Sequence, residues 1–208
     1  MPRAFADITF TESVKAAQQR YGSREQNKHF EFADDPRNSL GEKEIQFLQA
    51  RDSFYQATVS ENGWPYVQHR GGPIGFLKVL DERHFGYADF RGNFQYISVG
   101  NINHDDRVSL ILMDYAHRRR LKIWGHAQIV HQTENPELIA LLSHAEYGAT
   151  VERGVVIRVE ALEWNCPQHI TQRFTDADIE QVLMPLIEEN KMLKARLKVR
   201  DQPSNDAE

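Results

Sequence analysis

The sequence is poor in cysteine and has no long apolar run, and both features limit what this chain can be. Cys166 is the single cysteine among 208 residues, so an intramolecular disulfide is impossible and a reducing compartment is favoured. No apolar stretch approaches the roughly 18 residues that a membrane-spanning helix needs. The segment from Met1 to Asp7 lacks the apolar core of a signal peptide. We therefore expect a cytoplasmic protein without membrane segments.

An excess of basic charge is also missing. Lysine and arginine together number 25, aspartate and glutamate 30, and the formal net charge is -5, so no nucleic-acid partner is expected. The nine histidines show no zinc spacing such as His-Glu-x-x-His, and we expect no metal site. A composition of 40% hydrophobic and 26% charged residues is ordinary for a soluble globular protein of one domain with appendages.

The chain begins with helical patterns and then changes to alternation. Helices are expected at 9–20, with Thr11 as N-cap, and at 42–51, joined by an irregular polar arm over 23–39. From Ser53 onward apolar and polar residues alternate, which is typical of half-buried strands. Asn62-Gly63 predicts a tight hairpin. The expected strands are 53–59, 66–70, 76–80, 85–88, 108–113, 121–129 and 155–164.

Further helices are expected between and after these strands. They cover 97–103, a segment from Asn135-Pro136 to about Tyr147, and a C-terminal helix that opens at Thr175 with a capping box and is kinked or restarted at Pro185. The C-terminal helix packs either on a partner subunit or on its own domain. The fold class is therefore α+β, with an antiparallel β-barrel, peripheral helices and a C-terminal helix.

Two short turns marked by glycine lie between strand-like runs, at 69–75 and 90–98. They place an arginine, amides and hydroxyls in loops on a β scaffold, where binding residues often sit. Charge and hydrogen-bond donors suit a phosphate, and neutral polar groups suit the edge of a ring. The pattern is what a site for a phosphorylated, planar cofactor needs.

The order of several short motifs in this chain resembles that of a known family. The motifs that carry the resemblance are, in chain order, 54–59, 63–65, 68–73 (Gln-His-Arg-Gly-Gly-Pro), 92–93, 100–102, 107–110, 121–127 and 164–170 (Trp-Asn-Cys-Pro-Gln-His-Ile), followed by Arg173. Over roughly 40–174 their order resembles the pyridoxamine 5'-phosphate oxidase-like superfamily of FMN-binding split barrels. The resemblance implies a split-barrel homodimer with two FMN sites at the subunit interface. It also implies three regions: N-terminal helices and arm at 1–52, the FMN-binding barrel at 53–174, and a helical arm and tail at 175–208.

The resemblance also implies roles for individual residues. Arg70 matches the arginine that grips the FMN phosphate, and Gln68 and His69 lie beside the ribityl chain or the ring edge. The loop before the phosphate-binding turn and the turn itself contribute Asn93, Gln95, Tyr96, Ser98 and Asn101. From the other subunit, Arg120, Trp164, Gln168 and Arg173 match positions that complete the pocket.

Simpler interpretations stand beside these roles. Arg70 is otherwise a surface arginine at a strand end, and Asn93, Gln95 and Ser98 are otherwise local turn caps. Cys166 is best explained as a small packed group. His69 is either a ring-edge donor or a structural residue.

The sequence departs from the oxidases proper at three places. The oxidases have a lysine soon after the arginine that ends the second strand, whereas here Gly71-Gly72-Pro73 intervenes before Lys78. Ile97-Ser98 replaces a basic pair, and the terminal Arg-Leu-x-Pro is absent. These losses argue against pyridoxamine phosphate as substrate. We expect an FMN-dependent oxidoreductase acting on a small molecule, with NAD(P)H as a candidate electron donor, and no catalytic residue is identified. The alternatives are a non-catalytic flavin sensor or carrier, and a split barrel that binds haem or a deazaflavin.

Overall fold

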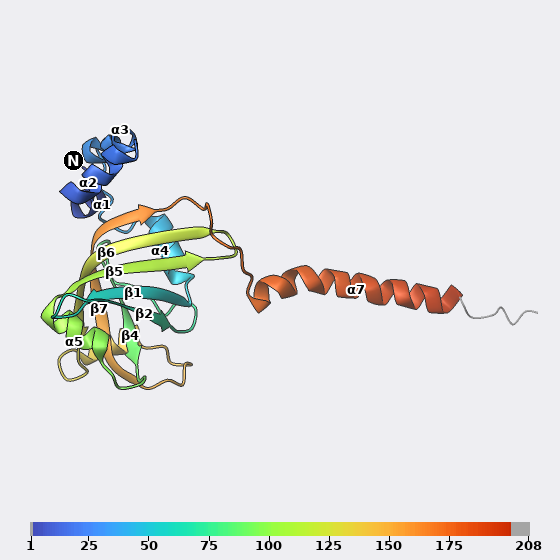
Figure 1. Ribbon diagram of the computed structural model, residues 1–208. Helices are drawn as coiled ribbons and strands as arrows, with labels where there is room; N and C mark the ends of the chain where they lie inside the picture. The colour runs from blue at the N-terminus through green and yellow to red at the C-terminus, as the bar shows by residue number, and fades with distance from the viewer. Residues whose placement is uncertain (1, 201–208) are drawn as a thin grey trace, which may run out of the picture. The chain divides into compact units, whose positions relative to one another are not determined.

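The structure, a computed structural model, describes residues 2–200, with the side chains of 198–200 left aside (Figure 1). The chain forms two compact units. The first, here called the barrel unit, contains Met1–Asp114 and Arg119–Pro167; the second, the C-terminal unit, contains Tyr115–Arg118 and Gln168–Glu208. Among the described residues, no helix is both long and apolar enough to cross a membrane.

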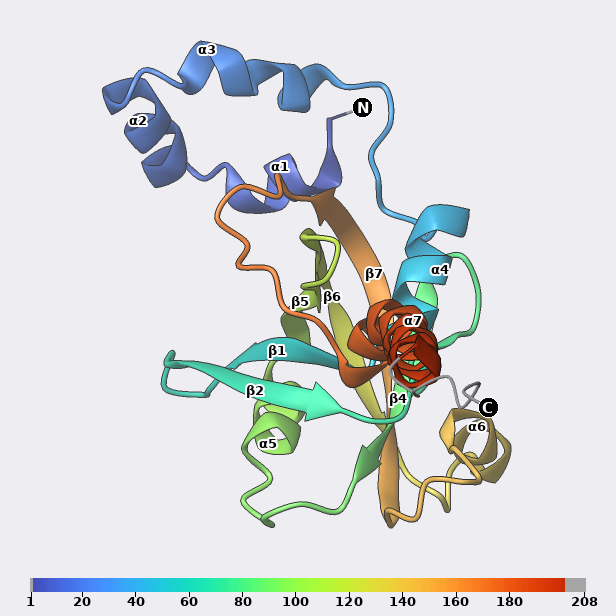
Figure 2. The same cartoon turned by 90° about the vertical axis from the view of Figure 1, so that its right-hand side faces the viewer.

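One antiparallel sheet dominates the barrel unit. Within the described residues it has seven strands in the order β2-β1-β5-β6-β7-β4-β3, curled into a split barrel (Figures 1 and 2). The strands are β1 Ser53–Val59, β2 Pro65–Gly71, β3 Lys78–Val79, β4 His84–Phe90, β5 Arg107–Asp114, β6 Arg119–Val130 and β7 Val151–Trp164. The expected α+β class with a split barrel is thereby confirmed.

Alternation along the first hairpin decides which side chains face the interior. Gly63 takes φ +85° between β1 and β2, as the Asn62-Gly63 signal predicts. On β1 the side chains of Phe54, Gln56 and Thr58 are buried. On β2 the half-buried positions are Tyr66, Gln68 and Arg70, whereas His69 is exposed. Because successive strand residues point to opposite faces, Gln68 and Arg70 share one side and His69 lies on the other.

The interior of the barrel is apolar, with a few buried polar groups. Its fully buried side chains include Phe54, Phe76, Leu77, Phe85, Tyr87, Leu110, Leu112, Leu121, Ile123 and Ile157. The Tyr87 hydroxyl donates a 2.8 Å hydrogen bond to Gln56 Oε1, and burial raises the pKa of Tyr87 well above its ordinary value. This hydrogen bond satisfies a hydroxyl that would otherwise be costly to bury.

Helices α4 (Glu42–Gln49), α5 (Ile97–His104) and α6 (Pro136–Leu142) lie against the barrel. α4 buries Phe47 and Leu48, α5 lies beside β1, and α6 lies beside β4 and β7 (Figure 2). The Asn135 side chain accepts from the Leu138 amide at 2.9 Å, as an N-cap should. The predicted extension of this helix to about Tyr147 is wrong, because Ser143 turns to an extended conformation at ψ 152°.

The N-terminal segment is more helical than the sequence predicted. It contains α1 (Ala4–Thr9), α2 (Glu12–Arg20), α3 (Arg24–Asn27) and a 3-10 helix, η1 (Lys28–Phe32). The helix expected at 9–20 is α2, which begins at Glu12 with the predicted N-cap Thr11, whose side chain accepts from Val14 N at 3.4 Å. The sequence did not predict α1. The irregular arm expected over 23–39 is wrong for 24–32.

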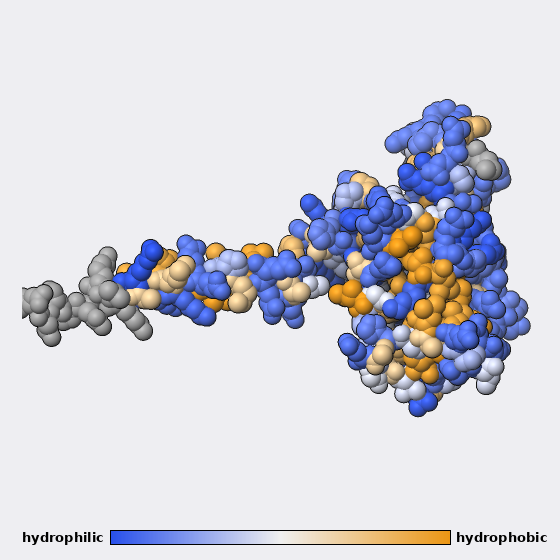
Figure 3. Space-filling model, turned by 180° about the vertical axis from the view of Figure 1, so that it is seen from behind, coloured by the Kyte–Doolittle hydropathy of each residue, from blue (hydrophilic) through white to orange (hydrophobic). Residues whose placement is uncertain are grey.

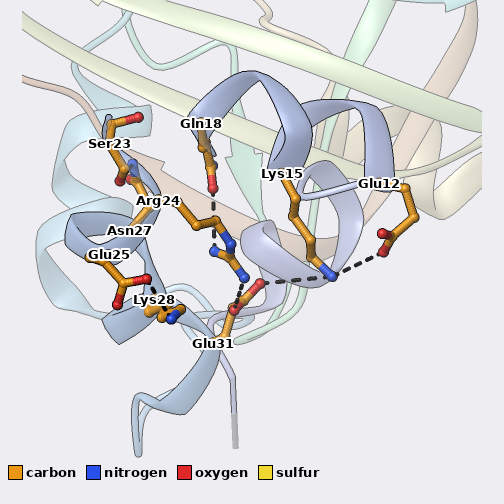
Figure 4. A network of polar contacts seen from close by, with 9 residues as sticks. All are labelled: Glu12, Lys15, Gln18, Ser23, Arg24, Glu25, Asn27, Lys28 and Glu31. Carbon is orange, nitrogen blue, oxygen red and sulfur yellow. Dashed lines mark hydrogen bonds and ion pairs between the residues drawn. The ribbon is translucent and has the colours of Figure 1, made fainter. Parts of the chain in front are cut away.

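A polar network explains this difference (Figure 4). Arg24 reaches Glu31 at 2.6 Å and Gln18 at 3.3 Å, and Lys28 pairs with Glu25 at 2.6 Å. Because short helices are marginal alone, these contacts hold α2, α3 and η1 together. Phe5, Phe30 and Trp124 then anchor the segment on the barrel through ring contacts of 5.1 and 6.3 Å.

The C-terminal unit consists mainly of one helix, α7 (Asp176–Arg200). Its predicted capping box is confirmed: the Thr175 amide donates to Asp178 Oδ2 at 2.8 Å, and the Asp178 amide donates to Thr175 Oγ1 at 3.2 Å. Of the kink or restart expected at Pro185, the restart does not occur, because Pro185 lies inside the helix and the ribbon continues through it (Figure 1). Elsewhere in this unit, Gln172 donates to the Ala116 carbonyl at 2.7 Å.

Candidate functional site

A pocket lies between β2, the end of β4, the loop over 91–96 and the N-terminus of α5. Its cavity volume is about 50 Å³. Six of the residues predicted from the sequence line it: Gln68, Arg70, Asn93, Gln95, Tyr96 and Ser98. β2 supplies the first two by alternation, and the glycine-marked loop supplies the others.

Arg70 is the charged centre of this pocket, and it is already engaged. Its Nη1 donates to Asp89 Oδ1 at 2.6 Å, with 16% and 8% of the two side chains exposed. Arg153 approaches the other oxygen of Asp89 at 3.7 Å and lies over the Tyr96 ring at 4.9 Å. Among the described residues, the buried Arg70 Nε has no hydrogen-bond partner. Two guanidinium groups therefore share one buried carboxylate, and a donor remains unused.

The buried position of Asp89 shifts the protonation equilibrium of its carboxyl group. Burial raises the pKa of Asp89 above its ordinary 3.8, and the nearby Glu152 also raises it, against the lowering effect of Arg70 and Arg153. The Asp89 carboxyl therefore holds its proton to a higher pH than an exposed aspartate does, because burial disfavours its charged form.

Asp89→Asn is expected to remove a pH dependence of stability. Because the folded pKa is raised, the folded state binds more protons than the unfolded state above about pH 3.8, and the free energy of unfolding falls as pH rises through the folded pKa. Urea denaturation of the wild type and of Asp89→Asn at a series of pH values above about 3.8 measures how steeply the free energy of unfolding changes with pH in each protein. The wild type should show the steeper fall, and parallel curves would contradict the shifted pKa.

The N-terminus of α5 opens into the same pocket. Tyr96, at the N-cap position, adopts a left-handed conformation at φ 52°, and within the described part of the chain no side chain caps this helix. Free amides and the positive end of a helix dipole attract anions. Ser98 is buried behind them, and its hydroxyl donates to Gln68 Oε1 at 3.2 Å. This end of the pocket therefore suits a phosphate.

The loop residues have a local role as well. The Gln95 amide donates to Asn93 Oδ1 at 3.1 Å, and Asn93 Nδ2 donates to Gln95 Oε1 at 3.2 Å. Phe94 and Tyr96 both have positive φ, at 61° and 52°, a conformation that is unfavourable for bulky residues and clusters at binding sites. The turn-capping interpretation of Asn93 and Gln95 is thus compatible with their place in the pocket.

Two predicted residues lie near this pocket without lining it. Asn101 is buried and donates to Thr58 Oγ1 at 2.9 Å, which gives it a structural partner. His69 packs edge-on against Tyr55, with ring centroids 5.4 Å apart. Its side of β2 is opposite to that of Gln68 and Arg70.

The residues expected from the other subunit lie elsewhere. Trp164 ends the 14-residue β7 and donates to Glu44 Oε1 at 2.6 Å, and Arg120 Nε donates to Asn165 at 3.2 Å. Arg153 lies near the other end of β7, so most of the strand, at about 3.3 Å per residue, separates it from Trp164. Completion of the pocket by these residues requires a second chain and stays a prediction.

Gln168 and Arg173 belong to the C-terminal unit. Gln168 is exposed. The Arg173 guanidinium lies over the ring of Tyr115, 5.2 Å from its centroid. Their predicted roles likewise depend on a second chain.

The sequence prediction missed Tyr66, Asp89 and Arg153. Tyr66 was detectable, because it shares the alternation of Gln68 and Arg70, and its hydroxyl lies 3.3 Å from Gln68 Oε1. Asp89 and Arg153 were not, since the register that sets them opposite each other joins β4 to the distant β7. In the described part of the chain, no cluster of histidine, cysteine and acidic side chains suits a metal ion.

Comparison with known proteins shows which family the chain resembles. No curated protein sequence matches the chain. Similar solved structures include HupZ of Group A Streptococcus (17% identity, TM-score 0.49, 65% of this chain and 100% of that one) and a putative pyridoxamine 5'-phosphate oxidase of Lactobacillus delbrueckii (22%, 0.46, 61% and 94%). A third is an FMN-binding protein of Syntrophomonas wolfei (11%, 0.43, 74% and 96%). The model of one family, described as pyridoxamine 5'-phosphate oxidase, matches residues 40–168, and the chain therefore belongs to this family.

Proposed function

We propose that this protein is an FMN-dependent oxidoreductase that binds the flavin in the pocket around Arg70. The observation that carries the proposal is the convergence of Arg70, Ser98 and the uncapped end of α5 on one pocket, in a chain of the pyridoxamine 5'-phosphate oxidase family. A guanidinium, a hydroxyl and helix amides are the groups that recognise a phosphate.

The charges around Arg70 define how a phosphate would be held. Arg70 keeps an unused buried donor, and Arg153 already stabilises Asp89. A phosphate in the pocket would share Arg70 with Asp89, and the raised pKa of Asp89 favours its neutral form beside a new anion. The pocket residues therefore fit a phosphate, and Asp89 would take up a proton when the phosphate binds.

The remaining pocket residues suit the rest of the cofactor. Gln68, Asn93 and Gln95 provide amides for the ribityl chain and the ring edge, and Tyr96 provides an aromatic surface. When bound, FMN supplies the hydride or electron transfer, and the protein orients the ring and excludes water. We assign no catalytic residue.

The proposal includes a homodimer that completes each pocket. Arg120, Trp164, Gln168 and Arg173 would come from the second chain. Apolar side chains support this, since Tyr55, Val67 and Ile111 are exposed by 41%, 60% and 36% on neighbouring strands of the sheet. Contiguous exposed apolar surface of this kind marks interfaces. The substrate would be a small molecule, NAD(P)H the electron donor, and the cytoplasm the place of action.

The visible absorption spectrum of the purified protein tests the proposal. We expect flavin bands as isolated or after addition of FMN, and bleaching of these bands by NADPH without oxygen. Bound flavin that neither NADPH nor NADH reduces would favour a flavin sensor or carrier. A haem or deazaflavin spectrum, or no flavin binding at all, would overturn the proposal.

A further inference from the structure

Helix α7 exposes apolar side chains along its whole described length. Ile179, Leu183, Leu186, Leu193 and Leu197 are exposed by 42%, 45%, 56%, 50% and 50%. Figure 3 shows apolar groups interspersed among the polar side chains of the helix. Exposed leucines at this density mark an interaction surface.

The spacing of these residues identifies the kind of surface. Ile179, Leu183, Leu186, Asn190, Leu193 and Leu197 follow one another at alternating steps of four and three residues. This is the a/d pattern of a coiled coil, in which apolar residues recur every 3.5 residues on average. In heptad letters, Leu183, Asn190 and Leu197 occupy a positions, and Ile179, Leu186 and Leu193 occupy d positions.

We infer that α7 pairs with the α7 of a second copy of this chain as a parallel, in-register, two-stranded coiled coil. The inference stands on the heptad and does not need FMN. It is reinforced by the proposed homodimer, because linking two helices to one dimer raises their effective concentration to roughly the millimolar range. Such linkage would further stabilise a seam as short as this one.

Asn190 decides the orientation and the number of helices. In a parallel pair in register, the two Asn190 side chains meet across the seam and hydrogen-bond to each other. In an antiparallel pair an a residue packs against d residues, so Asn190 would face leucine and bury an unsatisfied amide. A single asparagine at an a position is the device that specifies register and two-stranded pairing.

Charges and apolar residues beside the seam agree with the same pairing. Glu189 occupies a g position and Lys194 the following e position, so each glutamate faces the lysine of the other helix in parallel pairing. One heptad earlier, the corresponding g and e residues are Val182 and Ile187, exposed by 66% and 42%, which extend the apolar contact. Pro185 falls at a c position, outside the seam.

A cross-linking experiment on the full chain tests this inference. In a Cys166→Ser background, Asn190→Cys places a thiol on the seam, and Glu188→Cys places one at the outer f position of the same helix. Under mild oxidation we expect Asn190→Cys to form a covalent dimer at least about tenfold faster than Glu188→Cys, because pairing sets a high effective thiol concentration. Equal rates for the two variants would overturn the inference.

A charge exchange supplies an independent readout. Adding Glu189→Lys to the Asn190→Cys chain places like charges across the seam and should slow cross-linking several-fold; adding Lys194→Glu as well should restore it. No slowing, or no restoration, would contradict parallel pairing. Flavin absorption of the same samples separates the two proposals. Cross-linking without bound flavin would refute only the FMN function. Bound flavin without cross-linking would refute only the coiled coil.

Discussion

Arg70→Ala, introduced together with Asp89→Asn, is expected to weaken FMN binding by about 100-fold or more relative to Asp89→Asn alone. The reason is that a guanidinium–phosphate pair combines two charge-assisted hydrogen bonds, each contributing roughly 1.5–3 kcal/mol. The double variant is needed because Arg70 is the 2.6 Å partner of a buried carboxylate. Removing the arginine alone would leave that carboxylate without its closest partner and destabilise the fold.

Fluorescence titration with FMN measures this loss, and Arg107→Ala provides the matched control. Arg107 has 74% of its side chain exposed and pairs with Asp105, two residues away, so its removal should leave FMN affinity unchanged. Circular dichroism verifies that the double variant is folded. If the folded double variant binds FMN as tightly as Asp89→Asn alone, the assignment of the phosphate to Arg70 is wrong.

Phe54→Ala is expected to lower the free energy of unfolding by roughly 3–5 kcal/mol, the cost of removing a large buried ring and leaving a cavity. Phe54 is 1% exposed, and its ring lies 6.0 Å from that of Phe76 and 5.2 Å from that of Tyr87. It is also the β1 residue paired with Arg70, so the cavity would open directly beside the proposed phosphate site.

Urea denaturation measures this effect against Val59→Ala on the same strand. Val59 is 39% exposed, and its truncation should cost no more than about 1 kcal/mol. A loss below about 1 kcal/mol for Phe54→Ala would mean that the interior rearranges to fill the cavity. If Phe54→Ala loses its flavin affinity together with its fold at low urea concentration, the packing around Phe54 supports the pocket.

Local patterns were sufficient to predict the barrel. Several features depend only on neighbours in the chain, and the structure confirms them: the alternation from Ser53 onward, the Asn62-Gly63 turn, and the caps at Asn135 and Thr175. The side of β2 that carries Gln68 and Arg70 follows from the two-residue period of a strand. The resemblance of the motifs then identified the family that the comparison shows.

Local patterns were insufficient where distant segments meet. The helices at 24–32 are stabilised in part by the packing of Phe30 against Phe5, which the local sequence did not indicate, and the end of α6 at Leu142 was also missed. The decisive case is Asp89: its sequence neighbours mark only the end of a strand. The pairing of β4 with β7 brings Arg153 to it, and the hairpin of β1 and β2 brings Arg70.

The sequence by itself thus determined the strands, the helix caps and the side of β2 on which Arg70 lies, because these follow from residue periods and local hydrogen bonds. Only the tertiary structure decided that Arg70 shares a buried carboxylate with Arg153, because that contact is set by the pairing of strands far apart in the chain. Burial then shifts the charge balance of the pocket, since the energy of a charge depends on its surroundings as well as on the residue that carries it.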